Sequence, residues 1–393
     1  MNPIFPTQFS VTGESASPQR AAVVGAGMAG AACAEGLRRA GFTVTVFEKS
    51  RGVGGRMATR RAAWADAAGA PQTASFDHGS QGFSARSPRF KAVVGRAQAL
   101  GHLARWRPRV HAEFPAPVRR EMYVPLPTMS AFCRHLLAGV EVRLGQAVRR
   151  LRRDADGWHL LMEGGDACGP FDQVLLALPA PQAARLLAGH DAAVVATLAG
   201  VQMQPCWTLM AICDDVDWPW DAAEPGEGPL ALVARVDRTP GRAAPAGRSI
   251  WIAHATAPWS AAHLNDEPES IRSALCEALG RQLPGRQARL WQHTAVHRWR
   301  HAFAPAAALG TAPCWWQPAL QLGACSDAFG NGTVEAAWRS GDELADTVAA
   351  WLEFNDPALA PADRESAAPG AASVARQDAA PEPLRDRGAP LVR

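Results

Sequence analysis

The sequence predicts an α/β fold, and three of its features carry that prediction. A buried strand at residues 22–24 leads through three glycines into a small-residue helix at 31–40. A second apolar strand at 44–47 closes on an acidic residue, Glu48. Residues 201–303 hold several further runs with strand character and one long helix. We therefore expect a Rossmann-like α/β domain and an interleaved α+β second domain that is mostly antiparallel.

The first of these features predicts dinucleotide binding. Gly25, Gly27 and Gly30 have G-x-G-x-x-G spacing, which allows a tight turn, a close approach of the backbone to a pyrophosphate, and close packing of helix and strand. The helix N-terminus offers unpaired N–H groups to phosphates. Glu48 follows Gly30 by 18 residues, where a carboxylate can accept ribose hydroxyls. The alternative is an ordinary tight turn that binds no ligand.

A second glycine-rich segment at 49–57 favours FAD over a released NAD. Its glycines let the chain pass close to a ligand, and Arg51 and Arg56 can bind phosphate oxygens. A dehydrogenase that releases NAD does not need this second loop. The alternative is a basic surface loop.

Composition limits the functional classes. The net charge is +3, which is too small to indicate a nucleic-acid partner. No apolar stretch reaches 18 residues, and the N-terminus lacks the features of a secretory signal. Eight scattered cysteines without a CxxC pair predict reduced thiols in a cytoplasmic protein, with no membrane association. The termini, 1–19 and 356–393, are expected to be disordered.

Periodicity and turn residues predict the remaining elements. We expect helices at 92–105, 129–138 (with Ser130 as a possible N-cap), 182–187, 268–283 and 333–354. We expect strands at 140–144, 147–151, 158–162, 174–177, 207–212, 230–236, 250–255, 290–299 and 320–324, with a three-stranded excursion inside the first domain. The predicted FAD-binding domain comprises 20–90, 140–185 and 310–355, and the predicted substrate domain comprises 91–139 and 186–309.

Several motifs together resemble the renalase family of FAD-dependent oxidases, within the wider amine oxidase and glutathione-reductase-like flavoproteins. The matching segments span most of residues 20–355 in family order: VVGAGMAG (23–30), FEKSRGVGGRM (47–57), FDHGSQGFSARSPRF (76–90), MYVPLPTMSAF (122–132), FDQVLLALPAP (171–181), IAHATAPWS (252–260), HRWRHAF (297–303) and CSDAFGNGTVEAAWRSG (325–341). Two positions depart from the family pattern, because Gly82 replaces a usual tyrosine and Ser326 a usual glycine.

The resemblance implies a set of cofactor contacts. It assigns the ADP half of FAD to Gly25, Ala26, Gly27, Met28, Ala29, Gly30, Glu48, Lys49, Arg51, Gly55 and Arg56. It puts Asp77, His78, Gly79 and Gln81 beside the flavin ring, the backbone of Val148 at the adenine, Asp327 at the ribityl or pyrophosphate part, and the helix start at Thr333 and Val334 near the flavin. No cysteine or histidine stands in a recognised linkage motif, so we expect non-covalent FAD.

The resemblance also implies an activity. Renalase-like enzymes oxidise isomeric dihydronicotinamides (2- or 6-dihydro-NAD(P)), passing hydride to flavin N5, and dioxygen then reoxidises the flavin to give hydrogen peroxide and NAD(P)+. Such a substrate becomes aromatic on losing hydride, so no base is required. Amine oxidation fits less well, because no lysine follows Lys91 and Tyr123 is the one tyrosine, although 14 tryptophans are present.

The candidate catalytic residues are those expected near the ring and those expected in the substrate pocket: His78, Gln81, His254, Arg298, Trp299 and His301, with Arg300 beside them. The arginines can meet phosphate or carboxamide groups, and Trp299 can stack on a nicotinamide. The alternative is that Trp299 is a core residue and that alternate strand positions face solvent.

Three other patterns have simpler readings. His293, His297 and His301 recur every four residues, as metal ligands on a helix would, but the run is β-branched and aromatic, so we expect a strand and no metal. Asp214, Asp215 and Asp217 are interpreted as a solvated loop, and residues 149–153 as a solvated basic strand.

A flavin amine oxidase or desaturase and a non-catalytic FAD-binding protein remain the alternatives to a renalase-type oxidase. The oligomeric state is open.

Overall fold

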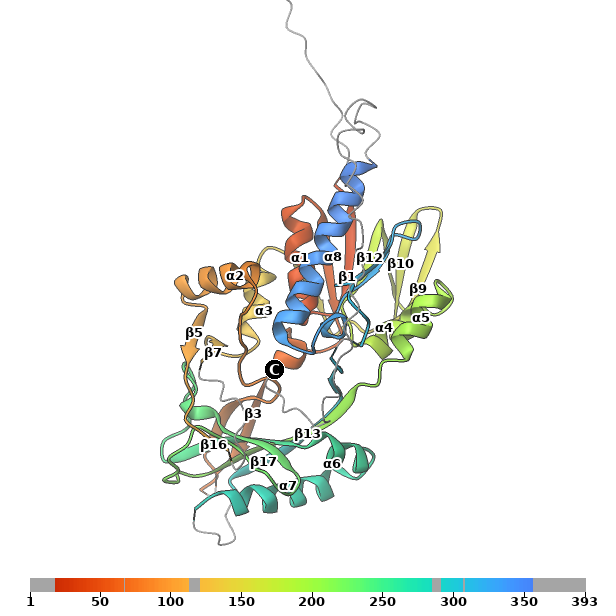
Figure 1. Cartoon of the computed structure of the whole chain (residues 1–393). Coiled ribbons are helices and arrows are strands. Elements are labelled where there is room, and N and C mark those ends of the chain that lie inside the picture. The colour runs from red at the N-terminus through yellow and green to blue at the C-terminus, as the bar shows by residue number, and fades with distance from the viewer. Residues whose placement is uncertain (1–17, 67, 113–120, 285–290, 307, 356–393) are drawn as a thin grey trace, which may run out of the picture.

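The computed structural model describes residues 18–66, 68–112, 121–284, 291–306 and 308–355. A six-stranded sheet forms the centre of the first part of the molecule (Figure 1). All its neighbouring strands pair in parallel except the last pair at one edge. Its spatial order is β18 (Trp315–Gln317), β19 (Leu322–Ala324), β12 (Gln173–Leu176), β1 (Arg20–Val24), β2 (Thr43–Glu48) and β8 (Glu141–Leu144). The predicted α/β class with a Rossmann-like domain is confirmed.

This strand order determines where a ligand can bind. The chain runs from β1 outward to β2 and β8, and then returns to the other side of β1 to form β12 and β19. Val24 is level with Phe47 in β2 and with Leu176 in β12, so the carboxyl ends of these strands meet at one edge. Ligands of open α/β sheets bind at such an edge, where the strand order reverses.

Two helices, α1 (Met28–Arg39) and α8 (Val334–Phe354), pack together over one face of this sheet (Figure 1). They approach unusually closely because glycines lie at the crossing. A Cβ on Gly341 would lie 2.0 Å from the carbonyl oxygen of Ala29, and one on Gly36 would lie 2.7 Å from the Cβ of Ala345. The small residues of α1 thus serve packing as well as ligand access.

A three-stranded antiparallel sheet covers the other face. The predicted excursion is therefore present, but its third strand, at 167–171, was not among the expected strands. It comprises β9 (Val148–Asp154), β10 (Gly157–Met162) and β11 (Ala167–Phe171), and it packs together with α4 (Ala180–Leu187) and α5 (Ala192–Ala199). Trp158 and Leu160 fill the interface, and Leu151 is the buried residue of an otherwise largely exposed, arginine-rich strand. The basic run is therefore a solvated strand, as interpreted from sequence.

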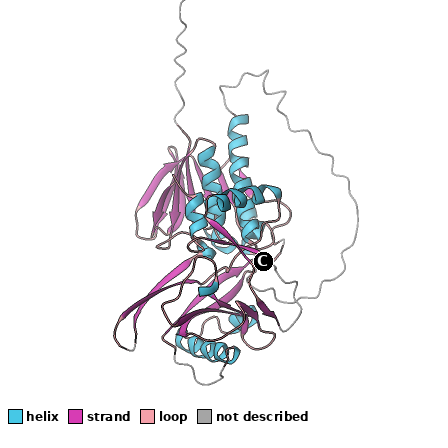
Figure 2. Cartoon of the chain, turned by 90° about the vertical axis from the view of Figure 1, so that its left-hand side faces the viewer, coloured by secondary structure: helices cyan, strands magenta, loops and turns pink. Residues whose placement is uncertain are grey.

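The second sheet is mixed and mostly antiparallel (Figure 2). Its order is β17 (His293–Phe303), β13 (Gln204–Asp214), β16 (Arg248–Ala255), β15 (Leu230–Arg235), β14 (Ala222–Glu224) and β6 (Val110–Ala112). α7 (Pro268–Gln282) packs against one face, with α6 (Ala257–Ala262) beside it. A hairpin of β3 (Thr59–Ala65) and β4 (Pro71–Asp77), absent from the sequence prediction, packs on the other face through Phe76 and Ala74.

Several predicted boundaries were wrong. The helix expected at 92–105 is α2 (Pro88–Ala99), because Ser87 caps it, Pro88 starts it and Gly101 (φ 75°) ends the turn after it. Its expected last residues form β5 (Leu103–Trp106), which pairs with β7 (Met122–Pro125).

The expected helix at 129–138 is the shorter α3 (Ala131–Leu136). Ser130 makes no side-chain capping bond there. The strand expected at 290–299 runs over β17 instead, and residue 290 lies outside the described part.

Other predictions concern the termini, the thiols and membranes. Residues 1–17 and 356–393 lie outside the described part, whereas Gln19 is hydrogen-bonded to Thr43 and Gln173. None of the eight cysteines, all of which lie in the described ranges, forms a disulfide bond, as predicted. Within the described ranges, no helix has the length and apolar character needed to cross a bilayer.

Candidate functional site: two glycine loops and a histidine-lined sheet face

The first glycine turn follows β1 directly and starts α1. Gly25 has φ 106°, and a Cβ there would lie 2.4 Å from the carbonyl oxygen of Ala177. A Cβ on Gly30 would lie 1.9 Å from the carbonyl oxygen of Gly25. Gly27 caps α1 without a side-chain hydrogen bond, and no acidic residue stands in the first turn. The helix N-terminus, which begins at Met28 and includes Ala29, therefore keeps its N–H groups and positive dipole end for an anion.

Glu48 joins this turn to the second loop. Its carboxylate is buried and accepts the backbone N–H groups of Ala26 at 2.9 Å and Ser50 at 2.8 Å. Each carboxylate oxygen keeps a further lone pair, which suits a ribose hydroxyl. The structure thus fixes Glu48 at the sheet edge where sequence reasoning expected it.

The second glycine loop faces the first at close range. The N–H of Gly54 donates to the carbonyl oxygen of Ala26 at 2.9 Å, and a Cβ on Gly55 would lie 3.2 Å from the Cα of Gly27. Gly54 and Gly55 have φ values of 122° and 54°, which favour glycine. Two stretches of backbone without side chains therefore lie against each other, and we call them the cradle. They lie at the edge of the sheet where a dinucleotide would bind.

Arg56 does not stand free to bind phosphate. Its guanidinium makes a bidentate pair with Asp327 at 2.6 and 2.7 Å, and also donates to the carbonyl oxygen of Ala302 at 3.2 Å. Burial alone would lower the pKa of Arg56, but the charge and hydrogen bonds of Asp327 outweigh it, so the pKa is raised. Gly79 packs against the same residue, since a Cβ there would lie 1.9 Å from the carbonyl oxygen of Arg56. The pair links the second loop to the turn before α8.

Asp77 likewise has a structural partner. Its carboxylate binds Arg242 at 2.7 and 2.8 Å and accepts from Thr59 and the N–H of Met129. Both side chains of the pair are almost fully buried. Beside them, the Gln81 amide donates to the carbonyl oxygens of Asp77 and Gly79. The carboxylate predicted beside the flavin ring therefore ties β4 to the loop after β15.

One face of the second sheet carries a row of uncharged polar side chains. Thr208 on β13 lies opposite His254 on β16 and His297 on β17 in the strand register. Thr208 and His254 are completely buried. The contacts of Thr208 with Cys206 and of the His254 ring with the His78 backbone fall short of good hydrogen-bond geometry within the described residues. Buried polar atoms are rarely left without partners, so this row points to a ligand or water.

His78, directly after β4, covers this row. Its ring lies 4.9 Å from that of His297 and stacks on Trp299 at 5.0 Å, and the Trp299 indole donates to the His78 carbonyl oxygen at 3.2 Å. Burial lowers the pKa of His78 to about 3 and the pKa values of His254 and His297 to about 4. The rings are therefore neutral near pH 7, and the charge of Arg60 adds to the effect of burial on His78 and His297.

The remaining predicted residues lie in different surroundings. Arg298 faces the opposite side of β17, where it donates to Leu264 and lies over the Trp207 ring, so its predicted place in the pocket was wrong. Lys49, Arg51 and Arg300 are exposed. Burial and four neighbouring cations lower the pKa of His301.

Three further predicted residues lie on the framework of the first part. Val148 opens β9, and Thr333 caps α8, which begins at Val334, through a hydrogen bond from Ala336.

Both departures from the family pattern have local consequences. A Cβ on Gly82 would lie 3.3 Å from the backbone of Tyr123, so a larger side chain would press on β7. Ser326 is held by Ser340 and caps the short turn that carries Asp327.

Sequence reasoning missed Thr208 and Arg242, and it considered His297 only as part of a possible metal site. The even spacing of His293 and His297 on a predicted strand indicates that both side chains lie on the same face of the sheet.

Two aspartates of the Asp214–Asp217 loop form ion pairs with arginines. Asp215 pairs with Arg235 at 2.5 Å and Asp214 pairs with Arg248, so these carboxylates have protein partners. Within the described residues, no three His, Cys, Asp or Glu side chains are grouped to hold a metal ion.

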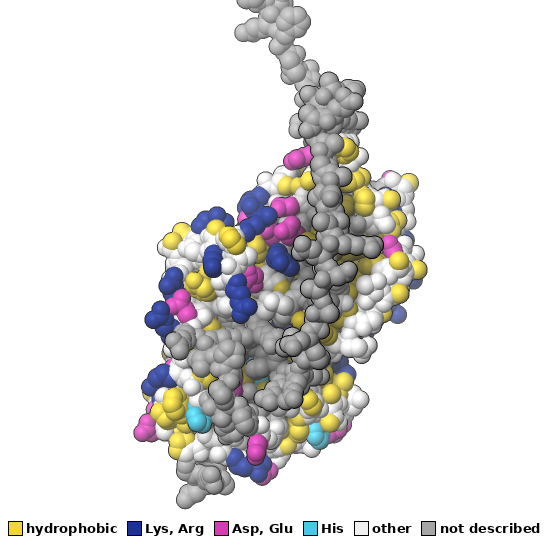
Figure 3. All heavy atoms as spheres, viewed as in Figure 1, with side chains coloured by type: hydrophobic (Ala, Val, Ile, Leu, Met, Phe, Trp, Pro, Cys, Tyr) yellow, Lys and Arg dark blue, Asp and Glu magenta, His cyan; other side chains and the backbone are white. Residues whose placement is uncertain are grey.

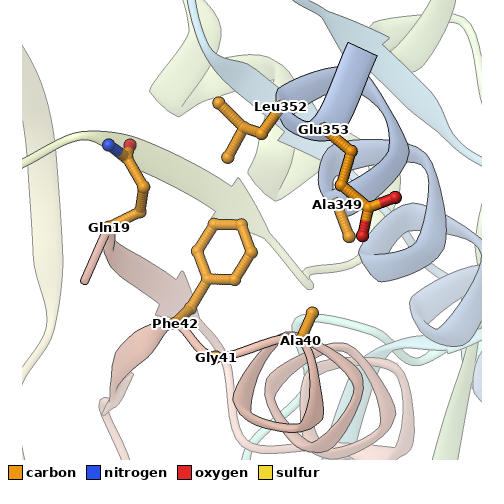
Figure 4. A pocket seen from close by; sticks show the side chains of 7 residues that line it. All are labelled: Gln19, Ala40, Gly41, Phe42, Ala349, Leu352 and Glu353. Atoms are coloured by element: carbon orange, nitrogen blue, oxygen red, sulfur yellow. The ribbon is translucent and has the colours of Figure 1, made fainter. Parts of the chain in front are cut away.

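Two cavities lie away from the histidine row. One of about 200 Å³, lined by Gln19, Phe42 and Leu352 among others, opens at the amino ends of the parallel strands, opposite the glycine turn (Figure 4). The other, of about 420 Å³, lies where β2 and β8 end, with Phe47, Leu144 and Gln146 in its wall. The second is at the edge where a dinucleotide would lie, and the first is not.

Comparison with known proteins agrees with this geometry. A family model of Rossmann-like NAD(P)-binding domains matches residues 23–97, and that of the flavin-containing amine oxidoreductases matches residues 116–349. The chain belongs to the flavin-containing amine oxidoreductases. It is therefore a flavin-dependent oxidoreductase of the amine oxidase type that acts on a small molecule.

Solved structures share the fold of this amine oxidoreductase. A provisionally named protoporphyrinogen oxidase from Exiguobacterium sp. 255-15 has a TM-score of 0.63 at 11% identity, with 85% of this chain and 99% of that chain covered. Cyclohexylamine oxidase from Brevibacterium oxydans IH-35A has 0.61 at 12% identity (86% and 100% covered). Putrescine oxidase bound to putrescine has 0.58 at 15% identity (85% and 99% covered).

Proposed function

We propose that this protein is a renalase-type oxidase that binds FAD non-covalently and takes a hydride from 2- or 6-dihydro-NAD(P), with dioxygen as the final acceptor and hydrogen peroxide and NAD(P)+ as products. FAD, when bound, supplies the hydride acceptor and the reaction with dioxygen. The two glycine loops, Glu48 and the N-terminus of α1 would hold its ADP half.

One observation carries the choice of substrate. The face formed by His78, Thr208, His254, His297 and Trp299 holds donors and acceptors but no carboxylate. Arg60 would repel a protonated amine at this face, because it already disfavours protonation of His78 and His297. A dihydronicotinamide is neutral, and its carboxamide offers the donor and acceptor that neutral imidazole and hydroxyl groups can satisfy.

The proposed reaction requires no catalytic base from the protein. Hydride loss makes the nicotinamide ring aromatic, so no side chain needs to remove a proton from carbon. The neutral histidines then orient the ring, and Trp299 and His78 exclude water from it. This agrees with a chain that contains no lysine after Lys91.

A second candidate is oxidation of a small amine. The family match and the two amine oxidases among the fold neighbours favour it. Such a substrate must bind as the free amine at this uncharged face, which predicts activity that rises steeply at alkaline pH.

Anaerobic mixing of the holoprotein with each substrate separates the candidates. We expect dihydronicotinamide isomers to bleach the flavin absorption and oxygen to restore it with release of peroxide, while putrescine and cyclohexylamine leave it unchanged. Bleaching by amines alone would instead support the second candidate. No bleaching by either class would indicate a flavoprotein without this turnover.

A matched pair of variants tests the histidine row itself. We expect Thr208→Val to raise KM for the isomers about tenfold, because a hydroxyl bond to the carboxamide is lost. Thr197→Val, at an exposed position of α5, serves as the control. If the two variants have the same kinetics, the row does not bind the substrate.

A further inference from the structure

A group of cations surrounds the end of β17. The charges of Arg185, Arg56, Lys49 and Arg300 all act on His301, and these residues come from α4, the second glycine loop, the loop after β2 and β17 itself. Segments far apart in the sequence thus bring positive charge to one place beside the cradle.

Most of this charge is unpaired. Many arginines elsewhere have carboxylate partners, as over α2, where Arg89 pairs with Asp342 and Asp346 and the two signs are interspersed on the surface (Figure 3). Within the described residues, no carboxylate pairs with Lys49, Arg185 or Arg300. Exposed cations gathered in one region without carboxylates give it a positive potential, which suits an anionic ligand.

The contacts of β17 place this group next to the cradle. Arg56 donates to the carbonyl oxygen of Ala302 at 3.2 Å, so the strand end touches the second glycine loop. Two residues on, Ala304 shares a core cluster with Ala183 and Ala184 of α4, the helix that carries Arg185. Lys49 follows Glu48 directly.

Charge neutralisation shows what the cradle lacks. The diphosphate of FAD carries two negative charges, whereas the glycine loops provide N–H donors without net charge, and the helix N-terminus provides about half a positive charge. Arg56 is already neutralised by Asp327. Additional cations beside the diphosphate would complete its neutralisation, and Lys49, Arg185 and Arg300 are available for this.

We propose that Arg185, Arg300 and His301, with Lys49, form an outer clamp on the diphosphate of the non-covalent FAD. This inference rests on the proposed cofactor, and it assigns Arg300 and His301 to the cofactor rather than to the substrate pocket. A clamp of long side chains across the outer side of the diphosphate would retain a cofactor that has no covalent link.

Binding to the apoprotein tests the clamp without any turnover. We expect Arg185→Gln and Arg300→Gln each to weaken FAD binding about tenfold, and salt to weaken it more in the wild type than in the double variant. Binding of riboflavin, which carries no phosphate, should be the same in all proteins. Arg96→Gln serves as the control, because Arg96 is an exposed cation on α2 that pairs with no carboxylate in the described part of the chain. Circular dichroism checks that each variant is folded.

The outcomes separate this proposal from the proposed function. Unchanged FAD affinity in both variants, or equal loss of FAD and riboflavin binding, would overturn the clamp. Unchanged FAD affinity with a raised KM for dihydronicotinamide dinucleotides would assign the cations to substrate phosphates, and would also overturn it. A wild-type protein that holds FAD but is not reduced by these isomers would contradict the proposed substrate and leave the clamp measurable.

Discussion

Acid should destabilise this protein through its buried neutral histidines, and His254 offers the sharpest test. Burial lowers the pKa of His254 from 6.5 to about 4. In the unfolded chain the ring regains its ordinary pKa and takes up a proton as the pH falls below about 6.5. The unfolded state then binds more protons than the folded state, so the free energy of unfolding falls with pH until about pH 4.

The size of the effect follows from the two pKa values. Between pH 7 and pH 5, protonation of His254 in the unfolded chain should lower the free energy of unfolding by about 2 kcal/mol. His78 and His297 should act in the same direction, but the three contributions do not simply add, because these rings disfavour one another's protonation. A loss of this size is a large fraction of a typical stability.

Urea unfolding at pH 7, 6 and 5 provides the assay. We expect His254→Asn to lose less stability between pH 7 and pH 5 than the wild type does, by about 2 kcal/mol, whatever its stability at pH 7. The same substitution at exposed His111 controls for loss of an imidazole and should keep the wild-type dependence. If His254→Asn and wild type have the same pH dependence, His254 is not held neutral by burial.

Three further predictions concern packing and charge. Gly30→Ala should abolish flavin binding because its Cβ would overlap the turn, whereas Gly52→Ala, in open space, should retain it; the flavin to protein absorbance ratio measures both. Asp77→Asn should lower the free energy of unfolding by about 3–5 kcal/mol because it leaves Arg242 buried without its partner, whereas Glu141→Gln, in an exposed pair, should change it by less than about 1 kcal/mol. Burial raises the pKa of Asp342 from 3.8 to about 6, so the folded state favours the neutral carboxyl and the free energy of unfolding falls as the pH rises from about 4 to 6. Asp342→Asn should remove this fall, which unfolding at pH 4 and pH 7 measures.

Each of these has a clear contrary result. Wild-type flavin content in Gly30→Ala would mean that the turn can open without loss of the cradle. Equal effects of the Asp77 and Glu141 substitutions would mean that burial of the Arg242 pair does not matter. A wild-type pH dependence in Asp342→Asn would assign the titration to other groups.

The parts of the site that are local in sequence could be predicted from it. Gly25, Gly27 and Glu48 lie in one short unit whose geometry is fixed by glycine conformations and by two adjacent strands. The start of α2 is also set locally, by Ser87 and Pro88, whereas apolar periodicity alone places the helix at 92–105.

The row of Thr208, His254 and His297 depends on distant pairings that sequence does not reveal. Thr208 meets His254 and His297 only through the register of three strands from distant parts of the chain. The partner of Asp77 lies 165 residues away, at Arg242. A single sequence shows which residue types are present, but the strand register and the ion pairs decide which of them face the site.

The visible absorption spectrum of the freshly purified protein decides whether it binds FAD. We expect a yellow protein with about one flavin per chain after gel filtration, and we expect heat denaturation to release this flavin as FAD and to leave none on the polypeptide. A protein that remains colourless after incubation with FAD would contradict the cradle between the two glycine loops, and with it the proposed chemistry.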